Sequence, residues 1–209
     1  MRTARILLLA VLLCLILLWM DLGCSPRNFL TRRLAADLIS ASDTFKEPQS
    51  FWLRTGIVSN KDFSAPDYMV LQHRGWLIGS EVKCPAGIDP PPCWDVLLTP
   101  IGVEVVRPLI SSALAGNGRD NGPMEIPVAR RQLLGVSGIS KSATIADVEF
   151  TWRWVSVNPV GAALYDGGVH YRSTVGFRSY DDGWRVVDEN VPSSQTLEDA
   201  LRNAQPLAP

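Results

Sequence analysis

One segment of the chain alternates strictly between apolar and polar side chains: Val148-Glu149-Phe150-Thr151-Trp152-Arg153-Trp154-Val155-Ser156-Val157. Successive side chains of a β-strand point to opposite faces of the sheet, so this pattern predicts a strand with one packed face and one exposed face. The three aromatic residues would lie on the packed face, and Glu149, Thr151 and Arg153 on the exposed face. A sheet of this kind needs a second layer to cover its apolar side.

The neighbouring segments extend this strand into a sheet. Residues 170–178 repeat the alternation, with Tyr171, Val175 and Phe177 directed inward. Asp181-Asp182-Gly183 then predicts a tight turn into a further strand at 184–187. With residues 126–139 as the preceding strand, the simplest topology is an antiparallel meander of about four strands.

The first part of the chain favours helices. Apolar residues recur at helical spacing over 30–41, and the segments 66–74 and 99–110 combine helix-start signals with apolar faces. A short strand is expected at 51–57, and a short C-terminal helix follows Thr196. These helices are the largest apolar surface available to cover the sheet, so the sequence predicts an α+β fold.

We expect the chain to be organised in four regions. Residues 1–23 form a signal peptide or membrane anchor, and residues 24–115 form a helical part that contains a β-hairpin. Residues 116–123 form a linker or surface loop, because they consist of residues that break regular structure. Residues 124–209 form the antiparallel sheet part with its short C-terminal helix.

Cys84 and Cys93 are predicted to form a disulfide at the base of a hairpin. The residues between them are rich in proline and glycine, and the flanking segments 76–83 and 94–99 have strand character. Closing a loop of about ten residues contributes roughly 2.5–3 kcal/mol. A redox-active pair and a metal site are the alternatives, although a zinc site usually needs four ligands and only His73 stands nearby.

The N-terminal segment has the pattern of an export signal. Arg2 and Arg5 precede an unbroken apolar run from Ile6 to Met20. Secretory signal peptides combine a positive start with roughly 7–15 apolar residues, whereas a membrane-spanning helix usually needs about 20. Such a segment can remain in place as an uncleaved signal anchor, or it can be cleaved so that the protein is simply secreted.

The end of this segment resembles the lipobox of exported bacterial lipoproteins. Leu22-Gly23-Cys24 places a small residue before a cysteine, and Asp21 stands where that family has an aliphatic residue. The resemblance implies that Cys24 is lipidated and becomes the mature N-terminus. The protein would then be exported and held on the non-cytoplasmic side of a membrane, in the periplasm or at the cell surface.

Two weaker resemblances concern the folded part. Gly75-Trp76-Leu77 and Leu98-Thr99-Pro100-Ile101-Gly102, within residues 66–107, resemble the second half of a winged-helix domain. The strand pattern over 124–188 is similar to the curved sheets of cystatin-like and nuclear-transport-factor-like folds. The first resemblance implies a scaffold or protein-contact module, and the second implies a concave sheet that can hold a small ligand.

Composition disfavours several function classes. The chain has 20 Lys and Arg against 21 Asp and Glu, a formal net charge of −1. A nucleic-acid binder normally carries a basic stripe, and here only the pairs Arg32-Arg33 and Arg130-Arg131 stand together. The glycines of 116–122 lack the spacing of a dinucleotide fingerprint. We therefore expect no nucleic-acid partner, no cofactor and no metal.

A polar ridge on the exposed face of the sheet is the sharpest candidate site. His170, Arg172 and Arg178 lie on one strand, and Glu149 and Arg153 lie on the facing strand. His170 is the residue suited to proton transfer near neutral pH. The alternative is simple cross-strand charge pairing, which contributes about 0.2–1 kcal/mol per pair.

Three functions fit these observations. The first is a membrane-tethered envelope protein with a non-catalytic binding or structural role, whose domain binds another envelope protein or a component of the cell envelope. The second is a small-ligand-binding domain that uses an aromatic-lined sheet pocket around Trp152, Trp154 and Trp184. The third is a hydrolase centred on His170, with Glu149 or Asp188 orienting it beside Ser173 or Ser156. The first needs only the anchor and a compact fold, so the sequence favours a protein that is not an enzyme.

Overall fold

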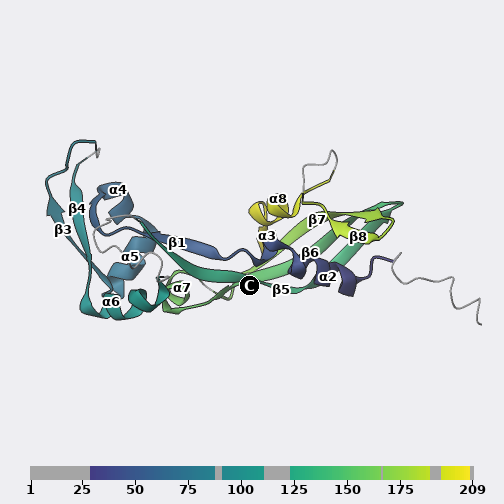
Figure 1. Ribbon diagram of the computed structural model, residues 1–209, viewed down its shortest axis with the longest axis horizontal. Helices are drawn as coiled ribbons and strands as arrows, with labels where there is room; N and C mark the ends of the chain where they lie inside the picture. The colour runs from purple at the N-terminus through teal and green to yellow at the C-terminus, as the bar shows by residue number, and fades with distance from the viewer. Residues whose placement is uncertain (1–28, 88–90, 111–122, 166, 189–193, 208–209) are drawn as a thin grey trace, which may run out of the picture.

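The fold is seen in a computed structural model that describes residues 29–87, 91–110, 123–165, 167–188 and 194–207. The molecule is elongated, with one group of elements at each end of its long axis and a narrow waist between them (Figure 1). The predicted signal or anchor segment 1–23 and the lipidation candidate Cys24 lie outside the described residues. The same holds for the predicted linker 116–123, apart from Pro123.

A six-stranded antiparallel sheet runs along the long axis. Its strands are β1 (Gln49–Leu53), β5 (Met124–Ser142), β6 (Ile145–Ser156), β7 (His170–Tyr180), β8 (Gly183–Val186) and β9 (Gln205–Leu207). The order is β1-β5-β6-β7-β8, and β9 also pairs with β7. The antiparallel pairing of the predicted meander is thus confirmed, and β1 and β9 extend it. The β7–β8 hairpin closes as predicted, with Tyr180 opposite Gly183.

The second sheet is a smaller one at the other end of the molecule. Its strands are β2 (Gly56–Ser59), β4 (Cys93–Leu98) and β3 (Leu77–Val82), in the order β2-β4-β3. The expectation of a single strand over 51–57 is wrong, because the chain passes from the large sheet to the small one after Leu53. The backbone N–H of Arg54 donates to the Tyr68 hydroxyl at 2.7 Å, and that hydroxyl donates to the Arg54 carbonyl at 3.2 Å. This distant tyrosine holds the chain where it changes sheet.

The helices are short, and most begin at a side-chain cap. They are α2 (Arg32–Ala41), α3 (Asp43–Lys46), α4 (Asn60–Phe63), α5 (Pro66–His73), α6 (Pro100–Val106), α7 (Pro159–Leu164) and α8 (Leu197–Arg202), with a 3-10 turn at Arg107–Leu109. Side chains that cap a helix N-terminus are Thr31, Ser42, Ser59, Thr99, Asn158 and Thr196. Each accepts a hydrogen bond from a backbone N–H three residues later, a group that otherwise lacks a partner.

The first hydrophobic core lies between the packed face of the large sheet and helices α2, α3 and α8. Phe150, Trp152 and Phe177 contribute from the sheet, and Ile39 and Leu197 contribute from the helices. Figure 1 shows these helices lying along the sheet at one end of the molecule. The prediction that helices cover the apolar side of the sheet is confirmed for the helix expected at 30–41. The helices expected at 66–74 and 99–110 pack instead in the second core.

The second core lies in the other lobe and joins elements from both parts of the chain. It packs the buried face of the small sheet against α4, α5, α6 and α7 and against the first residues of β5. Val58, Leu77 and Val96 come from the small sheet, and Ile126 and Val128 come from β5. Strand β5 therefore contributes to both cores and runs through the waist from one lobe to the other.

The disulfide between Cys84 and Cys93 is confirmed, with 5.1 Å between the two Cα atoms. Cys84 follows the end of β3 and Cys93 begins β4, so the bond closes the base of the predicted hairpin loop. Trp94 packs inward and stacks on Phe63 with 4.5 Å between ring centroids. None of the helices that the structure describes has the length and apolar character needed to cross a membrane.

Candidate functional site

The residues of the predicted polar ridge share the exposed face of the large sheet, but they form separate groups. Arg153 is directly opposite His170, and Glu149 is directly opposite Thr174. Four residues of β7 separate these two pairs, which is about 13 Å along a strand. Arg178 lies a further four residues along β7. The ridge is therefore a row of polar side chains, and the structure does not bring His170 and Glu149 together.

The residues considered for a hydrolase are also dispersed. His170 is exposed at the start of β7. Ser173 is buried, and its hydroxyl accepts a hydrogen bond from the Trp152 indole N–H at 3.0 Å on the packed side of the sheet. Burial raises the pKa of Asp188, and the nearby Asp43 raises it further, which places Asp188 near the start of α3. No two of these three candidate groups form a hydrogen bond in the structure.

Hydrogen bonds fix two members of the ridge. The Ser137 hydroxyl donates to Oε1 of Glu149 at 2.6 Å and lies 3.2 Å from its carbonyl oxygen. Nε of Arg153 donates to Oε1 of Gln132 at 2.8 Å. Both bonds join β5 and β6, so they turn the Glu149 and Arg153 side chains toward β5. Neither bond neutralises a charge, because each pairs one charged group with one neutral group.

A polar cavity of about 350 Å³ lies at the free edge of β7, and two residues of the ridge, Glu149 and Arg172, line it. Strand β9 covers this edge up to Arg172, and β8 covers it from Phe177 onward. The cavity occupies the gap between them. Its lining consists of Glu149, Arg172, Ser173, Thr174, Gln195, Ala200, Asn203 and Gln205. This grouping is not visible in the sequence, because α8, the residues on either side of it and β9 return to β7 from far along the chain.

An aromatic cluster at the waist occupies the packed face of the sheet. Trp152 stacks on Tyr171 at 4.7 Å between centroids, Trp154 meets Trp152 edge-on at 5.3 Å, and Tyr165 lies 5.9 Å from Trp154. Burial raises the pKa of Tyr165 above its usual value. Trp152 is only 2% exposed, so its ring belongs to the core. The cluster joins the two hydrophobic cores, and Arg131 covers one side of it.

The outer face of the small sheet is unexpectedly apolar. Ile78 and Leu97 are directly paired across β3 and β4 and are 56% and 51% exposed. Ile57 on β2 is on the same face, opposite Asp95, and is 47% exposed. Exposed apolar residues that adjoin one another mark interaction sites more often than isolated ones do. We call Ile57, Ile78 and Leu97 the outer apolar face.

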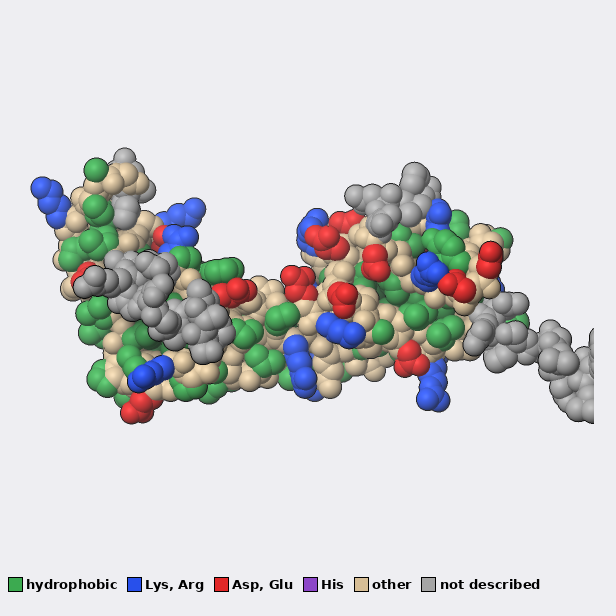
Figure 2. Space-filling view, in the orientation of Figure 1, with side chains coloured by type: hydrophobic (Ala, Val, Ile, Leu, Met, Phe, Trp, Pro, Cys, Tyr) green, Lys and Arg blue, Asp and Glu red, His purple; other side chains and the backbone are tan. Residues whose placement is uncertain are grey.

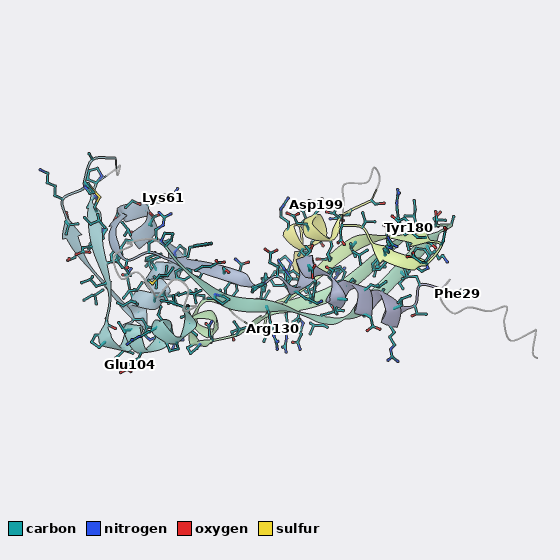
Figure 3. All side chains as sticks on the ribbon, in the orientation of Figure 1. Phe29, Lys61, Glu104, Arg130, Tyr180 and Asp199 are labelled. Atoms are coloured by element: carbon teal, nitrogen blue, oxygen red, sulfur yellow. A yellow bond between two sulfur atoms is a disulfide. The ribbon has the colours of Figure 1, made fainter. Side chains whose placement is uncertain are left out.

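The outer apolar face lies at the end of the molecule opposite the N-terminus of the described chain. Strands β3 and β4 form one extreme of the long axis in Figure 1, and Figure 3 places Phe29 at the other extreme. Figure 2 shows hydrophobic side chains along the outer edge of the lobe that carries β3 and β4. The opposite face of the small sheet packs into the second core, so the outer face is directed away from the body of the molecule.

The sequence contains a signal for the outer apolar face. In residues 77–82 and 93–98 the apolar residues do not alternate strictly with polar ones, since Leu77 and Ile78 are adjacent, as are Leu97 and Leu98. A strand with apolar side chains on both faces is typical of burial on both sides. Here one side has no covering element among the described residues. Those residues also contain no cluster of three His, Cys, Asp or Glu side chains that could hold a metal ion.

Comparison with known proteins gives no relative on which to base a function. No protein-family model, no curated protein and no solved structure matches the chain. The resemblances to bacterial lipoproteins, to a winged-helix half and to cystatin-like or nuclear-transport-factor-like sheets therefore stay predictions.

Proposed function

We propose that the chain is a membrane-tethered protein of the cell envelope with a non-catalytic binding role, in which the outer apolar face holds a second envelope protein. One observation carries the proposal. The N-terminal end of the described chain and the outer apolar face lie at opposite ends of the long axis (Figures 1 and 3). A tether attached before Phe29 would hold one end of the molecule at the membrane and direct the other end away from it.

The chemistry of the outer face favours a protein partner. Ile57, Ile78 and Leu97 expose aliphatic side chains beside Asp95 and Ser80, which are on the same face. Protein interfaces combine an apolar centre with polar groups of this kind at the rim. The adjoining helix α6 also exposes Ile101, which is 59% accessible. Removing such side chains from water stabilises a complex by about 25 cal/mol per Å² of apolar surface, before the costs of association.

The geometry disfavours two other occupants of this face. A symmetric pair of copies joined through the outer face would place their Phe29 ends at opposite extremes, so one membrane surface could not tether both. The lipid of the tethering membrane lies at the Phe29 end of the molecule, away from Leu97. A different protein, located farther from the membrane, is the occupant that agrees with both ends.

The experiment is site-specific photo-crosslinking in the native membrane. A photoreactive amino acid replaces Ile78, and adducts are identified by mass spectrometry. Leu97→Lys then introduces a charge beside the probe, and we expect this change to weaken the complex about tenfold or more, because a buried charge without a partner is costly. Leu134→Lys is the matched control, since Leu134 is 42% exposed on β5, outside the small sheet.

A single envelope protein that crosslinks at Ile78, binds the purified chain and is lost in Leu97→Lys but kept in Leu134→Lys would support the proposal. Three results would contradict it. An adduct with a second copy of the chain would make this face a self-association surface. An adduct with lipid would make it a membrane contact, and the absence of any specific adduct would leave the face without a partner.

A further inference from the structure

The cavity at the free edge of β7 has a polar lining of a distinctive kind. Glu149 and Arg172 provide one charge of each sign, and Gln195, Asn203 and Gln205 provide three carboxamides. The described residues that line the cavity include no aromatic side chain, so the flat apolar surface on which a sugar ring usually packs is missing. A volume of about 350 Å³ is within the range of small-molecule sites, roughly 300–1,000 Å³.

The two charged side chains that line the cavity do not neutralise each other. The ion pairs that the structure describes lie elsewhere, at Arg185 and Arg202, and Glu149 and Arg172 form none with each other. Their positions are nevertheless close, because Glu149 is opposite Thr174 and Arg172 is two residues from Thr174 on the same face. The cavity therefore offers a ligand one carboxylate and one guanidinium at neighbouring positions.

The backbone of β7 adds a third recognition element. Gly176 exchanges hydrogen bonds across this edge, donating to the carbonyl of Gln195 at 2.9 Å and accepting from the N–H of Val187 at 2.9 Å. Alternate residues of a strand direct their backbone groups to the same edge. Thr174, two residues earlier, thus turns its N–H and C=O toward the gap that the cavity occupies. An extended peptide can add to such an edge by main-chain hydrogen bonds.

We infer that this cavity binds a molecule that carries both an ammonium and a carboxylate group, either a free amino acid or a short peptide. Glu149 receives the ammonium group, and Arg172 receives the carboxylate in the bidentate manner that its planar guanidinium allows. When the ligand is a peptide, Thr174 bonds to its backbone, and the carboxamides of Asn203 and Gln205 donate to and accept from its amide groups. The Ser137 hydroxyl on β5 already binds Oε1 of Glu149, so the ammonium group of the ligand meets the other carboxylate oxygen.

This inference is independent of the proposed function. Residues of β6, β7, α8 and β9 line the cavity, whereas the outer apolar face belongs to the small sheet, which lies in the other lobe (Figure 1). A failure of crosslinking at Ile78 would leave the cavity untouched, and a failure of ligand binding would leave the outer face untouched.

The test is calorimetric titration of the full-length chain in detergent with four probes. L-Alanine and L-alanyl-L-alanine carry both charges, N-acetyl-L-alanyl-L-alanine lacks the ammonium group, and L-alanyl-L-alaninamide lacks the carboxylate. We expect saturable millimolar or tighter binding of at least one of the first two, and at least about tenfold weaker binding of each blocked peptide. Tighter binding of L-alanine identifies a free amino acid as the ligand, and tighter binding of the dipeptide identifies a peptide.

Matched variants locate the site. Arg172→Gln and Glu149→Gln should each weaken binding about tenfold while the circular dichroism spectrum and melting temperature stay unchanged. Arg130→Gln is the control, because Arg130 is exposed on the same sheet at the waist (Figure 3). Absence of binding at millimolar concentration, equal affinity for blocked and free peptides, or full affinity in both cavity variants would each overturn the inference.

Discussion

The guanidinium of Arg131 lies 4.7 Å from the centre of the Trp154 ring, and its Nη1 also donates to the carbonyls of Thr44 and Glu47 at 2.9 and 3.2 Å. One side chain thus fixes the last turn of α3 to the aromatic cluster at the waist. Burial lowers the pKa of Arg131 from its usual value, and the arginine stays protonated across the physiological range because its starting value is so high.

Loss of this arginine should destabilise the fold. We expect Arg131→Ala to lower the free energy of unfolding by about 2–3 kcal/mol, since it removes a cation–π contact and two hydrogen bonds from a charged donor. Urea denaturation followed by tryptophan fluorescence measures the change. The neighbouring Arg130 is exposed, so Arg130→Ala should change stability by less than about 0.5 kcal/mol. Equal effects of the two substitutions would show that the contact contributes nothing.

The disulfide between Cys84 and Cys93 should contribute about 2.5 kcal/mol. The two cysteines are nine residues apart in the chain, and closing a loop of that length removes conformational entropy from the unfolded state. The double variant Cys84→Ser, Cys93→Ser should therefore melt at a lower temperature than the wild type. Reduction of the wild type should reproduce the same shift. If alkylation without a reductant labels both cysteines in protein expressed with its own N-terminus, the bridge does not form.

Helix α7 should tolerate no side chain at Gly161. A Cβ atom built there would lie 1.8 Å from the carbonyl oxygen of Val128, which belongs to the backbone of β5 and cannot move aside cheaply. We expect Gly161→Ala to cost about 3 kcal/mol or more, at the upper end of overpacking effects. Gly135→Ala is the matched control, because a Cβ at Gly135 on the same strand would meet nothing within 4 Å. Thermal unfolding of both variants decides the comparison.

Sequence reasoning located the elements whose signals are local. The strict alternation around Trp152 gave a correct face assignment, and Asp181-Asp182-Gly183 gave a correct hairpin. Helix α7 was missed because its position depends on the close approach of Gly161 to β5 and not on an amphipathic pattern. The break between β1 and β2 was missed for a similar reason, since it depends on Tyr68, which is 14 residues from Arg54.

The candidate sites were predicted less completely than the fold. Glu149 and Arg172 were correctly placed on the exposed face, because side-chain alternation determines the face. Alternation gives no information on position along the strand relative to distant segments. The cavity depends on Asn203 and Gln205, which reach β7 only after α8 has turned back. The outer apolar face depends on which side of the small sheet the helices cover, and that is a property of the whole lobe.

Tyr68 should make stability sensitive to alkaline pH. Burial raises its pKa above the usual value near 10, although the hydrogen bond with Arg54 opposes this shift. The unfolded chain then loses its phenolic proton at a lower pH than the folded chain. The contribution of Tyr68 to the free energy of unfolding is therefore fully present below about pH 10, and it is lost as the pH rises through the higher folded pKa.

In Tyr68→Phe the loss of stability at alkaline pH should be smaller, while stability at neutral pH falls by about 1–2 kcal/mol because Arg54 loses its partner. Denaturation midpoints at neutral and alkaline pH test both effects, and an unchanged alkaline loss would contradict the assignment to Tyr68.

Cys24 should determine whether the chain is held at the membrane. If the resemblance to a lipobox is functional, the protein extracted from a bacterial membrane should have the mass of residues 24–209 plus a multi-acyl lipid. Cys24→Ala should abolish this mass and change the partition between membrane and soluble fractions. Cys14→Ala is the matched control, because Cys14 lies within the apolar run that would be removed.

An intact N-terminus without lipid would make the segment a signal anchor, which still tethers the Phe29 end. Cleavage without lipid would free the whole molecule and remove the geometric basis for the proposed role of the outer apolar face.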